Sequence, residues 1–383
     1  MKKNKIFLTL ALLFVSISFA IPKGPCDKKE VCCEEVEPGP FAFYYPKDMN
    51  LSCPKGFYVK GEFLLMQVKE EGLEYAITQN TTEVGVNNNA FPLTGGDIQG
   101  YSTGHHNWDW TCGARAGIGF YLNYDSLNVE AIWTYIRINN DSGKNLSGGR
   151  MLPFWLPPNL RGNGLAPPNI ASSARWTGNL NTLDLKLGKP YHISRYVIFN
   201  PHCGLRMAWI DQDYTSRNSG DFVIGPELLD ENLKMNAKND FWGVGPRVGI
   251  DTEWHFSDSW YLFGNMATSI LYSHFDVYQE LIFDDNTFYQ LKHGFYTNSP
   301  NMEINLGICW CHLFNKNKNM VSLKAAYEMH QWWDQNRLRR FFDKDTNTAT
   351  GPYSDISASN SNDEVARGDL TVNGFSFAIQ FDF

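Results

Sequence analysis

Apolar and polar residues alternate along residues 241–256, FWGVGPRVGIDTEWHF. Every second residue from Trp242 to Phe256 is apolar or uncharged, and the residues between them are glycine or polar and charged ones. Successive side chains of a strand point to opposite faces, so the pattern predicts a strand with one apolar and one polar face. The run exceeds an ordinary strand of about 5–6 residues. It fits a tilted strand that crosses a bilayer, which takes about 9–11 residues.

The same alternation recurs along the chain and predicts ten strands in all. The other nine lie near residues 56–68, 108–122, 126–138, 176–188, 195–211, 260–273, 299–313, 320–334 and 370–383. Residues 73–77 could extend the first strand or form another, so twelve strands is the second choice. The predicted fold is all-β, a transmembrane antiparallel up-and-down β-barrel.

The connections between these strands alternate between short and long. The short ones are polar, are flanked by aromatic residues, and lie at 123–126, 189–194, 257–259 and 315–319. The long ones lie near 79–106, 139–175, 214–234, 275–297 and 334–369. Outer-membrane barrels have short periplasmic turns, long external loops and aromatic girdles. The Pro-rich segment 151–169 either folds inward and constricts the barrel or projects outward.

The amino-terminal residues predict export from the cytoplasm. Lys2, Lys3 and Lys5 precede an apolar run, and Ser18 and Ala20 are small residues suited to cleavage, so residues 1–20 are expected to be a signal peptide. The alternative, a membrane-anchoring helix, is disfavoured because the run is shorter than the roughly 20 residues required. Residues 21–54 are expected to form a Cys-rich periplasmic extension and residues 55–383 the barrel.

No second apolar run has the length of a spanning helix. A membrane-integral chain must then be a closed barrel, because lipid cannot satisfy free backbone groups. The negative mean hydropathy agrees, since the inner face of a barrel is polar. A secreted soluble β-protein is the competing interpretation. The last strand has phenylalanines on one face and ends at Phe383, which resembles the signal read by the outer-membrane assembly machinery.

Charged residues of both signs fall on the predicted inner face. The candidate pore-lining residues are Lys60, Glu62, Arg115, Asp184, Lys186, Arg206, Arg247, Asp251, Glu253, Glu303, Lys324 and Glu328, and Asp109, Glu130 and Asp382 are further inward acids. Rings of charge can bias ion passage through a pore. Small barrels can instead fill their interior with side chains, and ten strands lie near that limit. The acidic excess favours cations if the lumen conducts.

Four of the eight cysteines, Cys26, Cys32, Cys33 and Cys53, precede the first predicted strand. Disulfides persist in exported proteins, and we expect these four to form them, within the chain or to neighbouring molecules. A metal site is the alternative, but the spacing lacks the pairs of a zinc site. The strand cysteines Cys309 and Cys311 are interpreted as small packing residues.

The net charge of −8 and the absence of a basic cluster argue against nucleic-acid binding. An enzyme is disfavoured, because no Gly-x-Ser-x-Gly element, His-Glu-x-x-His motif or phosphate loop occurs. A rim protease using Asp211 or Asp213 with His105 or His106 is a remote alternative. No cofactor and no metal are expected.

Several segments together resemble the pore-forming major outer membrane protein family of Legionella, which has relatives in Chlamydia-like bacteria. They are GEFLLMQVKEEGLEYAI (61–77), DWTCGARAGIGFYL (109–122), NPHCGLRMAWIDQDY (200–214), FWGVGPRVGIDTEWHF (241–256) and AAYEMHQWWDQNRL (325–338). The resemblance implies a multi-pass barrel in bacterial outer-membrane lipid that conducts solutes. Chlamydial members are cross-linked by disulfides, which bears on the amino-terminal cysteines.

The expected function is therefore a porin-like channel for passive diffusion of small hydrophilic solutes through a narrow charged lumen. The alternative is a surface-exposed structural or adhesin barrel, disulfide-linked in the envelope, with little or no conductance. The large loops at 139–175 and 334–369 are candidate binding surfaces for that second role.

Overall fold

A computed structural model describes residues 56–79, 97–99, 109–122, 127–146, 150–155, 170–194, 196–224, 227–283, 285–343, 361–365 and 368–383. The predicted signal peptide, the predicted periplasmic extension and its four cysteines lie outside these residues. Among the described residues every regular element is a strand, and no helix is long and apolar enough to cross a membrane.

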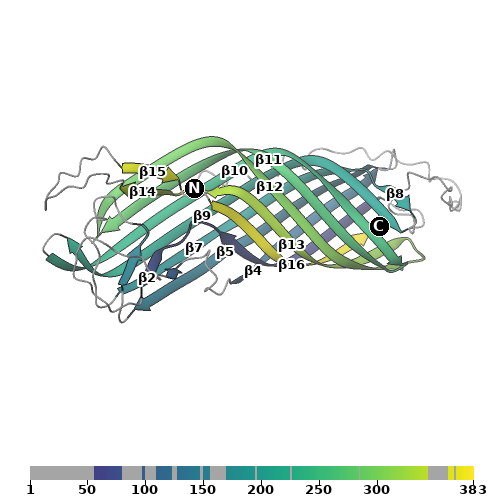
Figure 1. The fold of residues 1–383 in the computed structure, drawn as a ribbon. Helices are drawn as coiled ribbons and strands as arrows, with labels where there is room; N and C mark the ends of the chain where they lie inside the picture. The colour runs from purple at the N-terminus through teal and green to yellow at the C-terminus, as the bar shows by residue number, and fades with distance from the viewer. Residues whose placement is uncertain are drawn as a thin grey trace. The chain divides into compact units, whose positions relative to one another are not determined.

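Ten strands form a closed antiparallel barrel, which confirms the first choice of strand number (Figure 1). Each strand pairs with the next along the chain, and the last strand pairs with the first. The barrel strands are β1 (Phe57–Glu70), β4 (Trp110–Leu122), β5 (Leu127–Leu146), β7 (Ile170–Gly188), β9 (Val197–Ile224), β10 (Glu227–Ser257), β11 (Trp260–Phe283), β12 (Asn286–Phe314), β13 (Asn319–Asn336) and β16 (Gly368–Asp382).

Six shorter strands lie outside this ring. β2 (Ala76–Gln79), β3 (Asp97–Gln99) and β6 (Arg150–Pro153) make a separate three-stranded sheet, and β14 (Arg339–Asp343) pairs with β15 (Ser361–Val365). The 73–77 segment therefore neither extends β1 nor adds a barrel strand. β8 (Tyr191–Ser194) pairs with β9 inside the predicted 189–194 connection.

The two ends of the barrel differ in their connections. At one end, here named the short-turn end, residues 258–259 and 315–318 are turns. Asn315, Lys316 and Asn317 all have positive φ angles, a conformation that asparagine tolerates better than most residues. The opposite end, named the loop end, carries the β2–β3–β6 and β14–β15 sheets (Figure 1).

The outer face of the barrel carries an exposed apolar belt toward the short-turn end. Exposed residues include Ile118, Trp133, Val248, Leu306 and Phe377, each from a different strand. Side chains on the opposite face of the same strands are polar or charged, as in Glu62, Asp184 and Arg247. This is the arrangement that a barrel needs in lipid, and it follows from the period-two pattern of the sequence.

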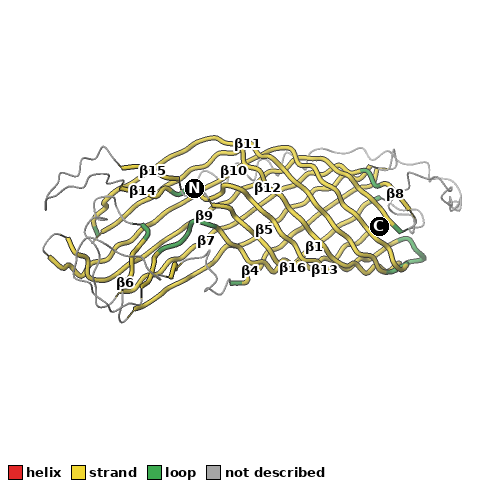
Figure 2. The backbone as a smooth tube through the Cα atoms, in the orientation of Figure 1, coloured by secondary structure: helices red, strands yellow, loops and turns green. Residues whose placement is uncertain are grey.

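Two predicted external loops, 214–234 and 275–297, are strands instead. β9 and β10 pair up to Ile224 and Glu227, and β11 and β12 pair up to Phe283 and Asn286. Figure 2 shows these strands continuing toward the loop end without interruption. The predicted boundaries were wrong because the prediction assumed that every strand has an apolar outer face, whereas these extensions have a polar one.

The apolar face of a single strand changes sides at the end of the belt. On β10, Trp242 is exposed on the outer face, whereas Phe241, Ala237, Met235 and Leu233 are buried on the inner face. The alternate residues, such as Lys238, then face outward. Beyond lipid the outside is water, so the extension buries its apolar side chains inside, like a soluble β-sandwich.

The barrel interior is therefore divided into two parts. Toward the loop end lies a hydrophobic cluster, here named the apolar core, which includes Leu64, Met66, Leu73, Tyr75, Ile138, Trp155, Trp176, Ile210, Leu233, Met235, Phe241, Leu271, Phe275, Leu281, Trp332 and Leu338. Toward the short-turn end the interior is mostly polar and charged, with one small apolar cluster of Tyr261, Phe263, Cys309 and Ala326. The sequence patterns predicted the polar part and missed the apolar core.

Candidate functional site

A cavity of about 130 Å³ lies inside the barrel, in the polar half of the lumen. Eleven of the twelve candidate pore-lining residues line it: Lys60, Glu62, Arg115, Asp184, Lys186, Arg206, Arg247, Asp251, Glu303, Lys324 and Glu328. The twelfth, Glu253, is nearer the short-turn end, where its carboxylate lies 3.3 Å from the His255 ring. The alternation of side chains along the strands brought these residues to one side of the wall.

Arg115 on β4 has all its nitrogens engaged. Its Nη1 donates to Glu62 at 2.6 Å, its Nη2 to Glu328 at 2.8 Å and its Nε to Thr134 at 3.1 Å. Glu62 is the cross-strand neighbour of Arg115 on β1, whereas Glu328 reaches it from β13 across the lumen. The guanidinium thus joins three parts of the barrel wall.

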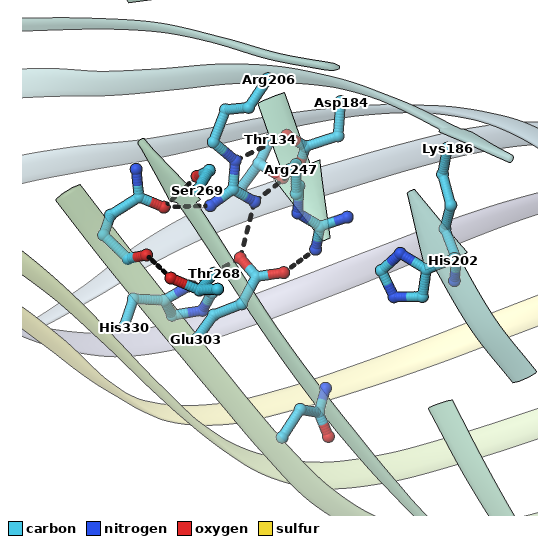
Figure 3. A network of polar contacts seen from close by, with 12 residues as sticks. Thr134, Asp184, Lys186, His202, Arg206, Arg247, Thr268, Ser269, Glu303 and His330 are labelled. Atoms are coloured by element: carbon cyan, nitrogen blue, oxygen red, sulfur yellow. Dashed lines mark hydrogen bonds and ion pairs between the residues drawn. The ribbon is translucent and has the colours of Figure 1, made fainter. Parts of the chain in front are cut away.

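Arg206 on β9 is saturated in the same manner. Its Nε and Nη2 donate to the two Asp184 oxygens at 2.6 and 2.7 Å, in a bidentate pair with the adjacent strand β7. Its Nη1 donates to Asn301 at 2.8 Å, and Nη2 also contacts Glu303 at 2.6 Å. Both acceptors of this second set lie on β12, so Arg206 also spans the lumen (Figure 3).

These contacts belong to one connected set, here named the charge network. Glu303 contacts Arg206, Arg247 and His330, and the chain of contacts then passes through Glu328, Arg115, Glu62, Lys60, Glu130, Lys186, Asp251 and His202. This chain of contacts begins at Asp184, the partner of Arg206, and comes back to the same strand, β7, at Lys186, two residues further along. The network thus runs round the lumen and joins strands that are not neighbours in the barrel wall.

Several members of the network were absent from the predicted site. His202, His330, Asn301, Asn305 and Thr134 share the inward face with the predicted charges. His330 lies 3.1 Å from Glu328, and Asn305 donates to Glu328 at 2.9 Å. The alternation of the sequence places these residues on the inner face. They were not predicted as site residues because they carry no fixed charge.

The three further inward acids have different surroundings. Glu130 is buried in the network, 2.6 Å from Lys60. Asp382 is buried near the short-turn end, where it accepts from Gln380 at 2.8 Å, and Gln380 in turn accepts from Lys324 at 3.1 Å. Asp109 precedes β4, is exposed and takes no part in the charge network.

Two glycines on the inner face, each beside an arginine of the charge network, let neighbouring strands approach closely. A Cβ at Gly204 or Gly245 would lie 1.8 or 2.0 Å from a backbone oxygen of the adjacent strand. Gly204 precedes Arg206 on β9 and Gly245 precedes Arg247 on β10, each two residues away on the same face. Only glycine allows the close approach of the wall at these two positions.

Three segments close the lumen at the loop end. Tyr75, Trp155 and Leu338 are all buried in the apolar core, although none belongs to a barrel strand. Trp155 Nε1 donates to the Tyr214 hydroxyl at 3.2 Å, and that hydroxyl donates to the Leu73 carbonyl at 3.1 Å. We predicted that the 151–169 segment either folds inward or projects outward. Its described part, residues 151–155, folds inward and lies in the barrel mouth.

The remaining predicted residues take no part in the charge network. Asp211 and Asp213 are exposed on the outer face of β9, and Asp213 is 3.1 Å from Lys238. His105 and His106 lie outside the described residues. Cys112 and Cys203 are exposed thiols, and the thiols of Cys309 and Cys311 donate to the Trp310 and Ser259 carbonyls. Within the described ranges no group of three His, Cys, Asp or Glu residues is arranged to hold a metal.

Comparison with solved structures finds distant β-barrels. The Escherichia coli outer membrane protease OmpT shares 9% identity, with 86% of this chain and 98% of that chain covered and a TM-score of 0.40. The TodX deltaS2S3 mutant monoaromatic hydrocarbon channel shares 8% identity over 86% and 90% of the two chains, with a TM-score of 0.26. A Pseudomonas aeruginosa FadL homologue shares 9% over 85% and 89%, with a TM-score of 0.23.

A comparison with curated proteins finds no match. Comparison with family models finds one that covers the barrel and the residues just before it, residues 52–383, and is described as the Legionella pneumophila major outer membrane protein precursor. This match spans every strand described above and confirms the resemblance seen in the five sequence segments. The chain is an outer-membrane β-barrel protein, and it belongs to the Legionella major outer membrane protein family.

Proposed function

We propose that the barrel is a channel for passive diffusion of small hydrophilic solutes across the outer membrane. The observation that carries this proposal is the charge network around a polar cavity at the level of the lipid-facing belt. Charged groups at membrane depth are costly and, where they occur, commonly line a path for ions or solutes. A barrel that served only as an anchor could fill this space with apolar side chains at lower cost.

The lumen has two parts with separate roles in this proposal. The charge network sets which solutes pass, because its groups face the cavity. It contains five Lys or Arg side chains and six carboxylates, and Lys324 also lines the cavity, so cations and carboxylates are equal in number when His202 and His330 are neutral. The lining therefore favours neither sign of ion, and the acidic excess of the sequence does not carry over to it. The apolar core closes the loop end, so conduction requires its loop-derived segments to move.

A second function is favoured by that same closure. The apolar core is packed with side chains that are almost completely buried, such as Tyr75, Leu271 and Phe275. A barrel sealed in this manner would serve as a structural or surface-displaying protein with little conductance. The two functions differ in whether the segments that carry Tyr75 and Trp155 can leave the mouth.

Liposome swelling with sugars of graded size tests the choice. Purified wild-type protein is compared with the double variant Tyr75→Ala/Trp155→Ala, which removes two large side chains from the closure. We expect slow swelling with the smallest sugars for the wild type and at least several-fold faster swelling for the variant. Trp133→Ala, which removes a lipid-facing ring of similar size, is the matched control and should resemble the wild type.

Planar-bilayer recording of the same proteins gives the selectivity. Channel steps with little preference between cations and anions would support the proposal in full. Absence of steps and of swelling in both the wild type and the double variant would establish the structural barrel instead. A strong preference for cations would contradict the balanced charges of the lining.

A further inference from the structure

Arg247 differs from the other arginines of the lumen in how its guanidinium is used. Arg115 and Arg206 each engage Nε, Nη1 and Nη2 with described side chains. Among the described residues, Arg247 engages Nη2 alone, with Glu303. Its Nε is buried and has no hydrogen-bond partner among the described residues. The residue as a whole is 7% exposed and lines the cavity.

The surroundings of Arg247 provide space and a second polar group. Gly245 and Gly249 flank it on the inner face of β10, so no β10 side chain covers the guanidinium from either side. His202 is the cross-strand neighbour of Gly249, and a Cβ there would lie 2.6 Å from His202 Cε1. The His202 ring therefore occupies the space between Arg247 and Asp251. Figure 3 shows His202 and Arg247 on the same part of the wall.

His202 has an unused nitrogen as well. Its Nε2 lies 3.4 Å from Asp251, whereas its Nδ1 is buried without a hydrogen-bond partner in the described part of the chain. Buried polar atoms in proteins are nearly always satisfied by protein, water or a bound group. With Nε2 donating to the Asp251 carboxylate, Nδ1 of a neutral His202 is an acceptor that a water molecule can serve. The buried Arg247 Nε is a donor beside the same cavity, and it therefore indicates that a polar acceptor binds there.

We propose that Arg247 binds the carboxylate group of a small solute inside the lumen. The proposal deepens the proposed function and rests on it, because it names a class of solute for the channel. A carboxylate oxygen can accept from Nε while Glu303 keeps Nη2, and Arg is the side chain best suited to carboxylates. The other carboxylates near Arg247 are already engaged, Asp184 by Arg206 and Asp251 by Lys186.

The expected occupant is small. A cavity of about 130 Å³ admits a short monocarboxylate, together with some water, and excludes larger molecules while the apolar core stays closed. Acetate is the simplest probe of this class. Ordered water alone at the two nitrogens is the competing account, and it predicts no saturable binding.

Binding of ¹³C-labelled acetate to the purified full-length protein in detergent is measured by NMR line broadening, with the channel assay as a separate experiment. We expect saturable binding to the wild type, weakened at least ten-fold in Arg247→Gln. Arg247→Lys keeps the charge beside Glu303 but lacks Nε, and it should lose most of the binding while keeping the fold. Lys238→Gln removes an exposed cation from the outer face of the same strand and is the matched control.

The outcomes separate this inference from the proposed function. Equal acetate binding in the wild type, Arg247→Lys and Arg247→Gln, or no saturable binding at all, would overturn the carboxylate site even if sugars pass through the barrel. Saturable binding that depends on Arg247, in a protein that conducts nothing, would keep the site and refute the channel.

Discussion

At the scale of single residues, position along the barrel decides how a buried polar side chain is satisfied. Arg206 and Asp184 pair inside the belt, where each charge meets its opposite. Glu70 lies at the end of β1 beyond the belt, buried among apolar residues, with Gln212 donating to it at 3.2 Å. Burial raises the pKa of Glu70 to about 8, and the Gln212 hydrogen bond offsets only part of that shift.

This carboxyl makes stability depend on pH. Between about pH 4.5, where the unfolded glutamate ionises, and about pH 8, the folded protein holds a proton that the unfolded chain lacks. Its stabilising contribution is therefore complete below pH 4.5 and is lost as the pH rises to about 8. Glu70→Gln should remove this part of the dependence, measured as denaturant midpoints at pH 5 and pH 8.

Glu71→Gln, at the exposed neighbouring position, is the control and should keep the wild-type pH profile. A profile for Glu70→Gln identical to that of the wild type would mean that the Glu70 carboxyl is not buried in the folded state.

The site residues illustrate what a sequence can and cannot reveal at this scale. Alternation assigned Arg115, Glu62 and Glu328 correctly to the inner face, because the parity of a strand fixes which side each residue faces. It could not show that Glu328 crosses the lumen to Arg115, because that contact joins residues on strands that are not neighbours. Nor could it single out Arg247, whose distinction is an unoccupied Nε.

At the scale of elements, the long strands β9 to β12 show why loop boundaries were misplaced. Their belt portions, such as Trp242 to Phe256, have the expected apolar outer face. Past Trp242, toward the loop end, the apolar residues lie on the inner face of the same strand. A pattern that assumes an apolar, lipid-facing outer surface therefore no longer identifies that strand. The period-two alternation itself continues. A prediction that allowed either face of the strand to be apolar would have included these extensions.

The inverted face makes a sharp prediction for two adjacent residues of β10. Leu233 is buried in the apolar core, and Lys234 points to the outer side. Leu233→Ala should destabilise the folded barrel by about 2–5 kcal/mol, as expected for a buried leucine. Lys234→Ala should change the free energy of unfolding by only about 0.5 kcal/mol or less.

Guanidinium unfolding in detergent, followed by tryptophan fluorescence, measures both values. If 214–234 were an exposed loop, as the sequence patterns suggested, the two substitutions would have equally small effects.

At the scale of the whole molecule, closure depends on the pairing of the first and last strands. β16 lies between β13 and β1, and the register with β1 runs from Tyr58 opposite Asp382 to Glu70 opposite Leu370. The Phe383 amide donates to the Phe57 carbonyl at 3.0 Å, and the two rings stack with centroids 6.0 Å apart. The junction between β1 and β16, here named the seam, is thus held together at the short-turn end.

Phe383→Ala should therefore lower the fraction of folded barrel in the outer membrane at least several-fold. Heat-modifiable migration on gels separates folded from unfolded protein and measures this fraction. Phe256→Ala removes an exposed ring from β10, and it should leave the yield unchanged. A similar loss in both variants would point to a general need for aromatic rings rather than to the seam. Recognition of the last strand by the assembly machinery remains a separate proposal.

The amino-terminal cysteines also belong to this scale. Disulfides among Cys26, Cys32, Cys33 and Cys53, or from them to neighbouring molecules, remain a proposal based on the sequence and on the cross-linked chlamydial relatives. Described thiols such as Cys112 and Cys203 lie on the outer face of the barrel and take no part in the charge network.

The charge network also constrains how such a chain can change over generations. Glu303 serves Arg206, Arg247 and His330 at once, and Glu328 serves Arg115 and His330. Loss of Glu303 would take away the described ion-pair partner of Arg247, and loss of Glu328 would leave Arg115 with Glu62 alone, so a single replacement is penalised while a concerted one is not. Across descendants, these positions should therefore mutate in matched groups, whereas the lipid-facing positions drift one by one.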